Sequence, residues 1–326
     1  MKVFLTGANG LLGHNILKIL LDRGYFVNVI VRRADSLHIS NDEQLRVYEG
    51  SFLDEKALQE AMNECTAVIH AAGCTDMSAS YDEFKSVNVD GSRILIEVSR
   101  RKNVSNIVFI STANTIGYGS PLCHSSEDAP IQYPFSDSSY AMTKRQAEQL
   151  FIEESFLRPD THIVILNPGF MLGAYDSKPS SGALLRAAYR RPLMLAPCGG
   201  KCFIHVSDVA AAAVDALKLG ESGKRYMLGN YNMSIADYYR LQRKVLGYRQ
   251  CICVIPRWIM SLLGALGDLV CRMGLRTRVT QNNLEQLCVM EYYDNTRAVE
   301  TLKLAKTPLE TAIIDCAGWM KMNNML

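Results

Sequence analysis

The sequence predicts an α/β fold: a doubly wound parallel sheet with helices on both faces, followed by a smaller, mostly C-terminal lobe. Apolar stretches of strand length alternate with amphipathic stretches of helical length through residue 168, which is typical of successive strand–helix–strand units. After residue 168 the alternation becomes irregular, and polar loops separate shorter elements. We therefore expect a first domain over residues 1–168 and a substrate-binding lobe mainly over residues 169–326, with an interleaved boundary.

Composition excludes several classes of protein. A net charge of +2 with 21% charged residues implies no strong field for a nucleic acid or a membrane, so we expect no nucleic-acid partner. The ten cysteines have no zinc-type spacing, so we expect reduced thiols, no metal site and a cytoplasmic location. The chain enters a strand directly after Met1, which leaves no room for a signal peptide, and no apolar stretch reaches the ~18 residues of a membrane-spanning helix.

A glycine-rich turn follows the first expected strand, residues 3–5, and leads into an amphipathic helix through about Leu21. One glycine allows the tight turn, one lets a pyrophosphate approach the backbone, and one lets helix and strand pack closely. The helix N-terminus offers amide groups and a partial positive charge to phosphates. The turn therefore predicts a Rossmann-type sheet that binds NAD(P) through Gly7, Ala8, Asn9, Gly10, Leu11, Leu12 and Gly13.

The second strand, residues 25–31, suggests which dinucleotide is preferred. An NAD site usually has an Asp or Glu at the end of this strand for the ribose 2′-hydroxyl. Here Arg32 and Arg33 follow Val31, and an arginine can pair with a 2′-phosphate. NADP(H) is therefore favoured and NAD(H) is possible, unless both arginines belong to a solvated loop.

The third and fourth strands are expected at residues 45–49 and 67–73. Asp54 is expected to cap the helix after the third strand. His70 is interpreted as a packed strand-end histidine rather than a catalyst, and the small residues Ala71, Ala72 and Gly73 after it would let the backbone approach a cofactor. Asn88, before the next helix, is a candidate cofactor-binding residue that would act through a water or backbone contact, and it fits a plain helix cap equally well.

Hydroxyl groups end the fifth strand, residues 107–113, at the edge of the sheet where ligands bind. A long loop over residues 114–138 is expected to cover the substrate. The following helix places Tyr140 and Lys144 one turn apart on the same face. The pKa of a phenol is ordinarily near 10, and a neighbouring ammonium would lower it toward the range of proton transfer. A sixth strand, residues 162–166, ends at Pro168 and Gly169.

Together these motifs resemble the extended short-chain dehydrogenase/reductase superfamily, and most of all its dihydroflavonol-reductase and hydroxysteroid-dehydrogenase branch. The resemblance covers roughly residues 1–220. It implies that Tyr140 transfers the proton, that Lys144 also binds the nicotinamide ribose, and that Thr112 holds the substrate oxygen. Aligning on Tyr118 instead would put Asn114 in the place of Thr112. The resemblance further implies adenine contacts at Phe52 and Leu53, nicotinamide contacts at Pro168 and Gly169, and a possible homodimer.

Three functions fit this pattern. The first is an NADP(H)-dependent ketone or aldehyde reductase, or alcohol dehydrogenase, with a small-molecule carbonyl or alcohol as substrate. The second is a nucleotide-sugar epimerase or dehydratase that retains NAD, for which an acid would be expected after the second strand. The third is a non-catalytic dinucleotide-binding regulator, against which the intact set of Thr112, Tyr140 and Lys144 argues.

An apolar helix is expected over residues 256–273, with arginines at its end. It is too short to span a bilayer. Packing in the core or at a dimer contact is the favoured interpretation, and contact with a membrane surface is the alternative.

Overall fold

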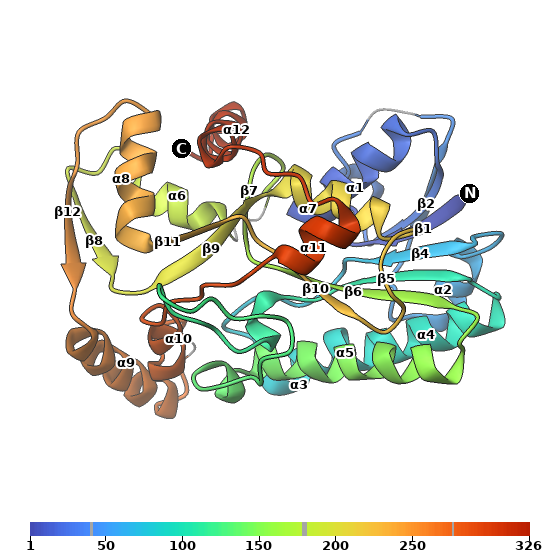
Figure 1. The fold of residues 1–326 in the computed structure, drawn as a ribbon, viewed down its shortest axis with the longest axis horizontal. Coiled ribbons are helices and arrows are strands. Elements are labelled where there is room, and N and C mark those ends of the chain that lie inside the picture. Colours follow the sequence, from blue (N-terminus) through green and yellow to red (C-terminus); the bar gives the residue numbers. More distant parts are fainter. Residues whose placement is uncertain (40–41, 178–180, 276) are drawn as a thin grey trace.

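The computed structural model describes residues 1–39, 42–177, 181–275 and 277–326. Its centre is a seven-stranded sheet in which every pairing is parallel, in the order β10-β6-β5-β4-β1-β2-β3 (Figure 1). These strands are β1 (Lys2–Thr6), β2 (Phe26–Val31), β3 (Leu45–Glu49), β4 (Ala67–His70), β5 (Asn106–Ile110), β6 (His162–Pro168) and β10 (Arg225–Leu228). The predicted parallel α/β fold is confirmed.

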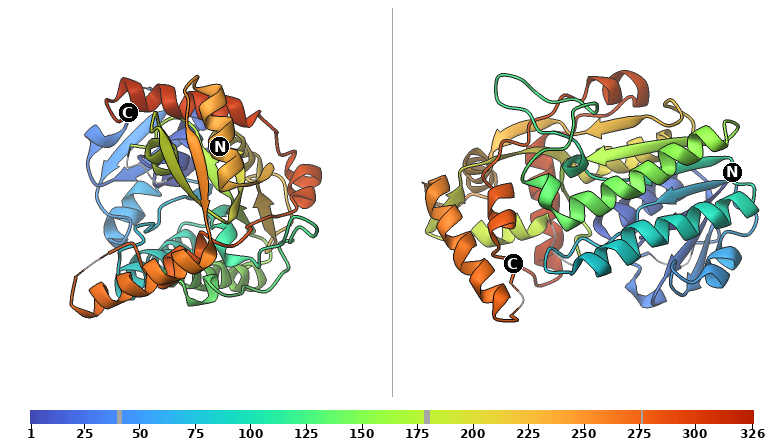
Figure 2. Two further views of the ribbon diagram at one scale, coloured as in Figure 1. Left: turned by 90° about the vertical axis from the view of Figure 1, so that its left-hand side faces the viewer. Right: turned by 90° about the horizontal axis from the view of Figure 1, so that it is seen from below.

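Helices cover both faces of this sheet, and each face has its own apolar core (Figures 1 and 2). One face packs against α1 (Leu11–Asp22) and α7 (Val206–Asp215). The other packs against α2 (Glu55–Ala61), α4 (Gly91–Arg101) and α5 (Ser139–Leu157). A short helix, α3 (Tyr81–Lys85), runs through a π-helical turn at Ser86–Asp90 into α4. Asp54 caps α2 as predicted, because its carboxylate accepts from the amides of Lys56 and Ala57.

The strand order reverses between β1 and β4. From β1 the chain proceeds outward through β2 and β3, and then returns to β4 and continues through β5 and β6 on the other side. Loops at the carboxyl ends of β1 and β4 therefore diverge, which opens a crevice where doubly wound sheets bind ligands.

The second lobe lies beyond those carboxyl ends, on the left of Figure 1. It contains a sheet in the order β11-β9-β7 and a separate parallel pair, β8 and β12. Its strands are β7 (Phe170–Leu172), β8 (Leu193–Pro197), β9 (Gly200–His205), β11 (Tyr231–Ser234) and β12 (Cys251–Ile255). Its helices are α6 (Gly182–Ala188), α8 (Ile235–Val245), α9 (Arg257–Arg272), α10 (Gln281–Gln286) and α12 (Leu309–Met322).

The chain passes between the two bodies several times. Residue 168 ends β6, but α7 packs on α1, and β10 pairs with β6 as the last strand of the first sheet. A further helix, α11 (Thr296–Leu302), packs against β10. Residues 114–138 have no strand and only short 3₁₀ turns, and Ser125 forms an isolated bridge with Tyr293. This loop thereby ties the first domain to the segment after α10.

The apolar helix expected over residues 256–273 is present as α9, but its packing in the core is not. Most of its large apolar side chains are exposed. Among the helices of the described residues, none is long and apolar enough to cross a membrane.

Candidate active site

A cavity of about 370 Å³ occupies the crevice where the strand order reverses. Many of the predicted cofactor contacts line it, although they come from four separate loops: Gly7, Asn9, Gly10, Arg32, Phe52, Leu53, Ala71, Ala72 and Gly73. Ala8, Leu11, Leu12 and Gly13 are buried behind the cavity lining, around the start of α1.

The three glycines of the first turn have different physical roles. Gly7 has a φ of +74°, and a Cβ there would lie 2.7 Å from the amide nitrogen of Ala72. A Cβ on Gly13 would lie 2.0 Å from the carbonyl oxygen of Gly7, so this glycine allows α1 to pack on the turn. A Cβ on Gly10 would come no closer than 3.4 Å to protein atoms and would face the cavity. Of these three glycines, Gly10 alone could carry a Cβ without colliding with the rest of the protein.

His70 supports the crevice from behind. The Thr6 hydroxyl accepts from the Ala72 amide at 3.1 Å and donates to Nδ1 of His70 at 2.7 Å. Nε2 of His70 is 3.4 Å from the Ser92 hydroxyl, which donates to the Asn88 carbonyl at 2.6 Å. Burial lowers the pKa of His70 to about 3. His70 is therefore a neutral, packed residue, as the sequence indicated.

The two arginines after β2 are not equivalent. Arg32 is exposed, lines the cavity and has no ion pair with any described residue. Arg33 does not line it, and its Nε lies 3.3 Å from Oδ1 of Asp35. The nearby acid at the end of β3, Glu49, accepts from the Ala34 amide at 2.7 Å. Arg32 is therefore the cation at this end of the cavity that is available to a ligand.

Thr112, Tyr140 and Lys144 meet where β5 ends against the start of α5. Ser138 caps α5, since its hydroxyl accepts from the Ala141 amide. The Thr112 side chain lies close enough to the Tyr140 phenol to lower its pKa, and its hydroxyl accepts from the Asn114 amide at 3.3 Å. It is thus Thr112, and not Asn114, whose side chain acts on the Tyr140 phenol.

Lys144 is buried and points beneath this pair. Its Nζ donates to the Ile110 carbonyl at 2.7 Å and lies 4.2 Å from the centroid of the Phe109 ring. Burial lowers the pKa of Lys144 to about 7.

The structure differs here from the expectation that Lys144 lowers the pKa of Tyr140. Burial raises the pKa of this phenol, and the influence that lowers it comes from Thr112. The physical reason is that burial outweighs the other influences on the phenol, and it also lowers the pKa of Lys144 to about 7, so that the charge of Lys144 is partly lost at neutral pH.

Asn88 is neither a helix cap nor a lining residue of the cavity. It lies in the π-helical turn before α4, where its Oδ1 accepts from the Cys74 amide at 2.8 Å and its Nδ2 donates to Thr143 at 3.2 Å. Asn88 therefore ties the loop after β4 to α5. A Cβ on Gly73 would lie 3.2 Å from Asn88 Oδ1, so this loop is closely packed.

Pro168 and Gly169 end β6 beside β10 and β9. Pro168 is paired with Leu228, and the Gly169 amide donates to the Leu228 carbonyl at 2.8 Å. A Cβ on Gly169 would lie 2.4 Å from the Cys202 carbonyl oxygen. These two residues do not line the cavity, and their positions are fixed by the strands on either side.

Sequence analysis missed a buried carboxylate, Glu148, which lies one turn beyond Lys144 on α5. Its Oε1 accepts from the Thr115 hydroxyl and from Nδ2 of Asn167, both at 2.6 Å. The same two donors also reach the Thr112 carbonyl, at 2.9 and 3.1 Å. Glu148 thus holds the bend after β5 that carries Thr112. The sequence did contain a signal for this residue, because Glu148 continues the four-residue spacing of Tyr140 and Lys144 along one face of the helix.

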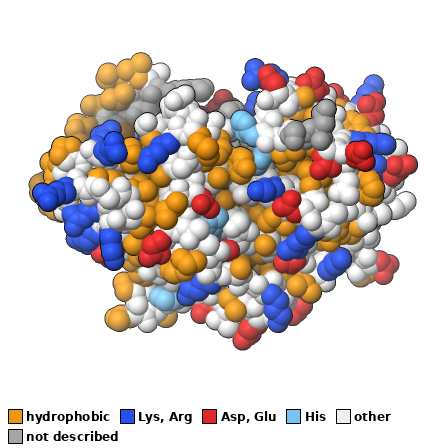
Figure 3. Space-filling model, turned by 90° about the horizontal axis from the view of Figure 1, so that it is seen from above, with side chains coloured by type: hydrophobic (Ala, Val, Ile, Leu, Met, Phe, Trp, Pro, Cys, Tyr) orange, Lys and Arg blue, Asp and Glu red, His pale blue; other side chains and the backbone are white. Residues whose placement is uncertain are grey.

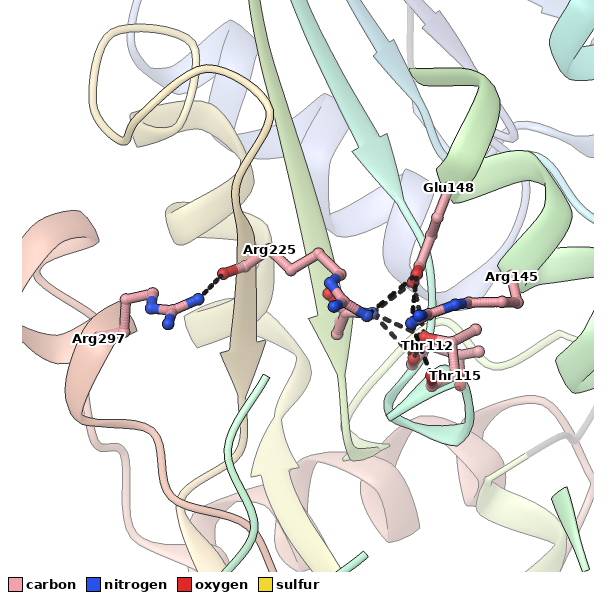
Figure 4. Close-up of polar contacts among 7 residues, drawn as sticks. Thr112, Thr115, Arg145, Glu148, Arg225 and Arg297 are labelled. Carbon is pink, nitrogen blue, oxygen red and sulfur yellow. Dashed lines mark hydrogen bonds and ion pairs between the residues drawn. The ribbon is translucent and has the colours of Figure 1, made fainter. Parts of the chain in front are cut away.

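Arginines balance the charge of Glu148. Figure 4 shows its carboxylate between the side chains of Arg145 and Arg225, whose Nη1 atoms are each 3.8 Å from Oε2. Arg145 also donates to the Thr115 carbonyl at 3.2 Å. Arg297 in turn donates to the Arg225 carbonyl. An ion network from α5, β10 and α11 therefore supports the Thr112 bend.

Comparisons with known proteins agree with this geometry. Residues 3–229 match the NAD dependent epimerase/dehydratase family. The chain is 26% identical to "Sterol demethylase protein B" of Methylococcus capsulatus, over 100% of both chains. It is 24% identical to a "Putative dihydroflavonol 4-reductase" of Synechocystis, over 98% of this chain and 94% of the relative.

A third relative is the 4-hydroxy-2-methyl-3-oxo-4-farnesyl-3,4-dihydroquinoline-1-oxide ketoreductase of Stigmatella aurantiaca. It is 30% identical over 70% of this chain and 68% of its own length. The crystal structure of UDP-glucose 4-epimerase from Thermotoga maritima superposes with a TM-score of 0.78, covering 99% of this chain and 100% of that one. At 17% identity this likeness shows the fold alone.

The cavity at the sheet crossing, the residues that surround it and the match over residues 3–229 lead to one conclusion. The chain belongs to the NAD dependent epimerase/dehydratase family and is an NAD(P)-dependent oxidoreductase of the extended short-chain dehydrogenase/reductase type.

Proposed function

We propose that this protein is an NADP(H)-dependent reductase or dehydrogenase that interconverts a ketone and an alcohol on an apolar small molecule. Two observations carry the proposal: the Thr112 side chain acts on the Tyr140 phenol, and the cavity ends at Arg32, which has no ion pair with a described residue. The first feature suits proton transfer to a carbonyl oxygen, and the second suits a 2′-phosphate.

The residues present fit a dinucleotide. The Gly7–Gly10 turn and the N-terminus of α1 would hold the pyrophosphate, since Gly10 leaves space there and no side chain caps α1. Phe52 and Leu53 line the cavity near Arg32 and would flank the adenine. When bound, the nicotinamide supplies or accepts the hydride.

The protein's own part in the reaction is proton transfer and orientation. Tyr140 is a protonated phenol at neutral pH, because burial raises its pKa, and it is therefore suited to donate a proton to a carbonyl oxygen. Thr112 would hold that oxygen through its hydroxyl. Lys144, with a pKa of about 7, would hold a ribose hydroxyl and exchange a proton with Tyr140 through it.

The relatives support an apolar substrate. One is named for a sterol, and another is named as a ketoreductase of a farnesylated quinoline oxide. An assay of the purified protein with NADPH and a panel of sterol and isoprenoid ketones, with UDP-glucose as comparison, tests this. We expect NADPH oxidation with at least one ketone. Conversion of UDP-glucose without net cofactor turnover would contradict the proposal and favour an epimerase.

Arg32 provides a matched test of cofactor preference. Arg32→Asp is expected to weaken NADPH binding about 10- to 100-fold, the scale of one charge-assisted contact, and to leave NADH binding unchanged or improved. Arg33→Asp is the control, because Arg33 is paired with Asp35 and does not line the cavity. Titration by fluorescence would measure both. Equal losses of NADPH affinity in the two variants would contradict the role of Arg32.

Two glycine variants separate ligand contact from folding. Gly10→Ala is expected to fold with nearly wild-type stability and to bind dinucleotide at least about tenfold more weakly, because its methyl group would enter the cavity. Gly13→Ala is expected to lose about 1–3 kcal/mol of unfolding free energy, since its methyl group would collide with the Gly7 carbonyl. Chemical denaturation and NADPH titration would measure the two effects. A Gly10→Ala protein with full affinity would exclude this turn as the phosphate site.

A further inference from the structure

Helix α9 is oriented with Met260 and two glycines inward and most of its large apolar residues outward. Met260, Gly264 and Gly267 are its buried residues, at the spacing of one helix face. A Cβ on Gly264 would meet Cα of Gln281 at 2.6 Å, so the backbones are in close contact. Helices of globular proteins normally turn their large apolar residues to the core.

Polar contacts also lie on the inward side of α9. Arg257 and Ser261 both hydrogen-bond to the carboxylate of Glu285 on α10, at 2.6–2.9 Å. Asp268 accepts from the Gln281 amide at 3.1 Å. These contacts, including those of the Arg257 guanidinium, anchor α9. Its large outward apolar side chains make none of them.

The outward side chains form a continuous stripe with helical spacing. We define the apolar stripe as five residues, each more than half exposed: Trp258 (69%), Leu262 (57%), Leu266 (54%), Leu269 (55%) and Met273 (67%). The neighbouring pair of strands at the same end of the molecule adds exposed Leu193, Leu195 and Val254, and β12 leads directly into α9 (Figure 2). Exposed apolar surface this concentrated marks an interaction site.

The charge of this end of the molecule indicates what covers the stripe. Residues 182–205 and 235–291, which include α10, contain twelve Lys or Arg and four Asp or Glu, whereas the rest of the chain contains 23 and 29. Figure 3 shows basic side chains gathered at its left end, over the second lobe. Arg272 ends α9 beside the stripe and has no ion pair with a described residue.

We propose that α9 binds the surface of an anionic lipid bilayer, with the apolar stripe in the interface and the basic lobe against the headgroups. An amphipathic helix that combines Trp and Leu with flanking arginines suits this position. Attraction of the basic end and repulsion of the acidic remainder would both orient the protein on the surface. A second copy fits less well, because a two-fold contact through the stripe would bring the two basic lobes together.

This orientation has a consequence for the active site. The consequence rests on the proposed function, whereas lipid binding itself does not. Helix α10 packs against α9, and Asn282 on α10 donates to the Pro134 carbonyl in the loop over residues 114–138. The bilayer would thus lie beside the segment that leads into α5 and Tyr140, and an apolar substrate can enter from it.

The tryptophans give a direct readout of the proposal. The chain has two, and Trp319 is 6% exposed whereas Trp258 lies on the stripe. The intact protein would be mixed with vesicles of phosphatidylcholine alone or with about 30 mol % phosphatidylserine, as in an anionic leaflet. We expect flotation with the anionic vesicles, a blue shift of tryptophan emission, and loss of binding in about 0.5 M NaCl, where charges are screened.

A matched pair of variants locates the contact. The double variant Leu262→Ser, Leu266→Ser is expected to lower vesicle binding at least about tenfold. The control is Phe156→Ser, Leu157→Ser at the end of α5, where both side chains are more exposed than the stripe pair, and it should bind as the wild type does. Absence of wild-type binding, or equal binding by the stripe variant, would overturn the proposal. So would a wild-type dimer, seen by light scattering, that the stripe variant converts to monomers without any lipid binding.

Discussion

Tyr140→Phe is expected to lower kcat for ketone reduction by about 10²- to 10⁴-fold, the usual contribution of a positioned proton donor. The ring would remain against Phe84, 5.9 Å away between centroids, so the start of α5 should keep its position. The hydroxyl that meets Thr112 would be lost, and with it the proton for the substrate oxygen. NADPH affinity should be nearly unchanged.

Single-turnover reduction by an enzyme saturated with NADPH would separate this chemical defect from binding. Tyr81→Phe is the control, because Tyr81 is an exposed tyrosine whose hydroxyl accepts from Gln146 on α5. A Tyr140→Phe enzyme as fast as the Tyr81→Phe enzyme would remove Tyr140 from the mechanism.

Glu148→Ala is expected to lower the free energy of unfolding by about 3–5 kcal/mol, the cost of removing one partner of a buried ion pair. The side chain of Glu148 is 1% exposed and that of Arg225 is 16% exposed, so water would compensate the abandoned guanidinium poorly. Thr115 and Asn167 would each lose an acceptor at 2.6 Å. Urea denaturation would measure the loss. A loss below about 1 kcal/mol would mean that the network stabilises the fold no more than an exposed ion pair does.

Glu148→Gln distinguishes a role in catalysis from a role in folding. The amide keeps an oxygen for Thr115 and Asn167, so most of the stability should return, but the negative charge that raises the pKa of Lys144 is gone. Burial would then lower that pKa below about 7, and Lys144 would lose its proton at a lower pH. We expect the alkaline limb of the kcat/KM profile to move to lower pH. An unchanged profile would restrict Glu148 to a structural role.

The parts of the fold that depend on local pattern were predictable from the sequence. The first six strands are short apolar stretches bounded by turns, and the Gly7–Gly13 spacing places the first helix. The seventh strand of the sheet, β10, was not foreseen, because nothing in residues 225–228 indicates that they pair with a strand some 60 positions earlier. Elements that return from the second lobe are specified by tertiary packing rather than by their own pattern.

The candidate site shows the same division. Helical spacing correctly placed Tyr140 and Lys144 on one face of α5, but it did not show that the Ile110 carbonyl would engage the ammonium. Glu148 was overlooked because an acid on a helix is ordinarily exposed. Its burial becomes evident only when α5, β6 and β10 bring Asn167 and Arg225 to it.

The central claim is that the enzyme exchanges NADP(H) at each turnover, and the dinucleotide itself tests this most directly. One portion of the gently purified protein would be denatured and any released dinucleotide identified by mass spectrometry, and a second, native portion would be titrated with NADPH and NADH. The account predicts exchangeable NADP(H), with NADPH bound much more tightly than NADH. Stoichiometric, tightly held NAD would contradict it and make a nucleotide-sugar epimerase or dehydratase the better interpretation.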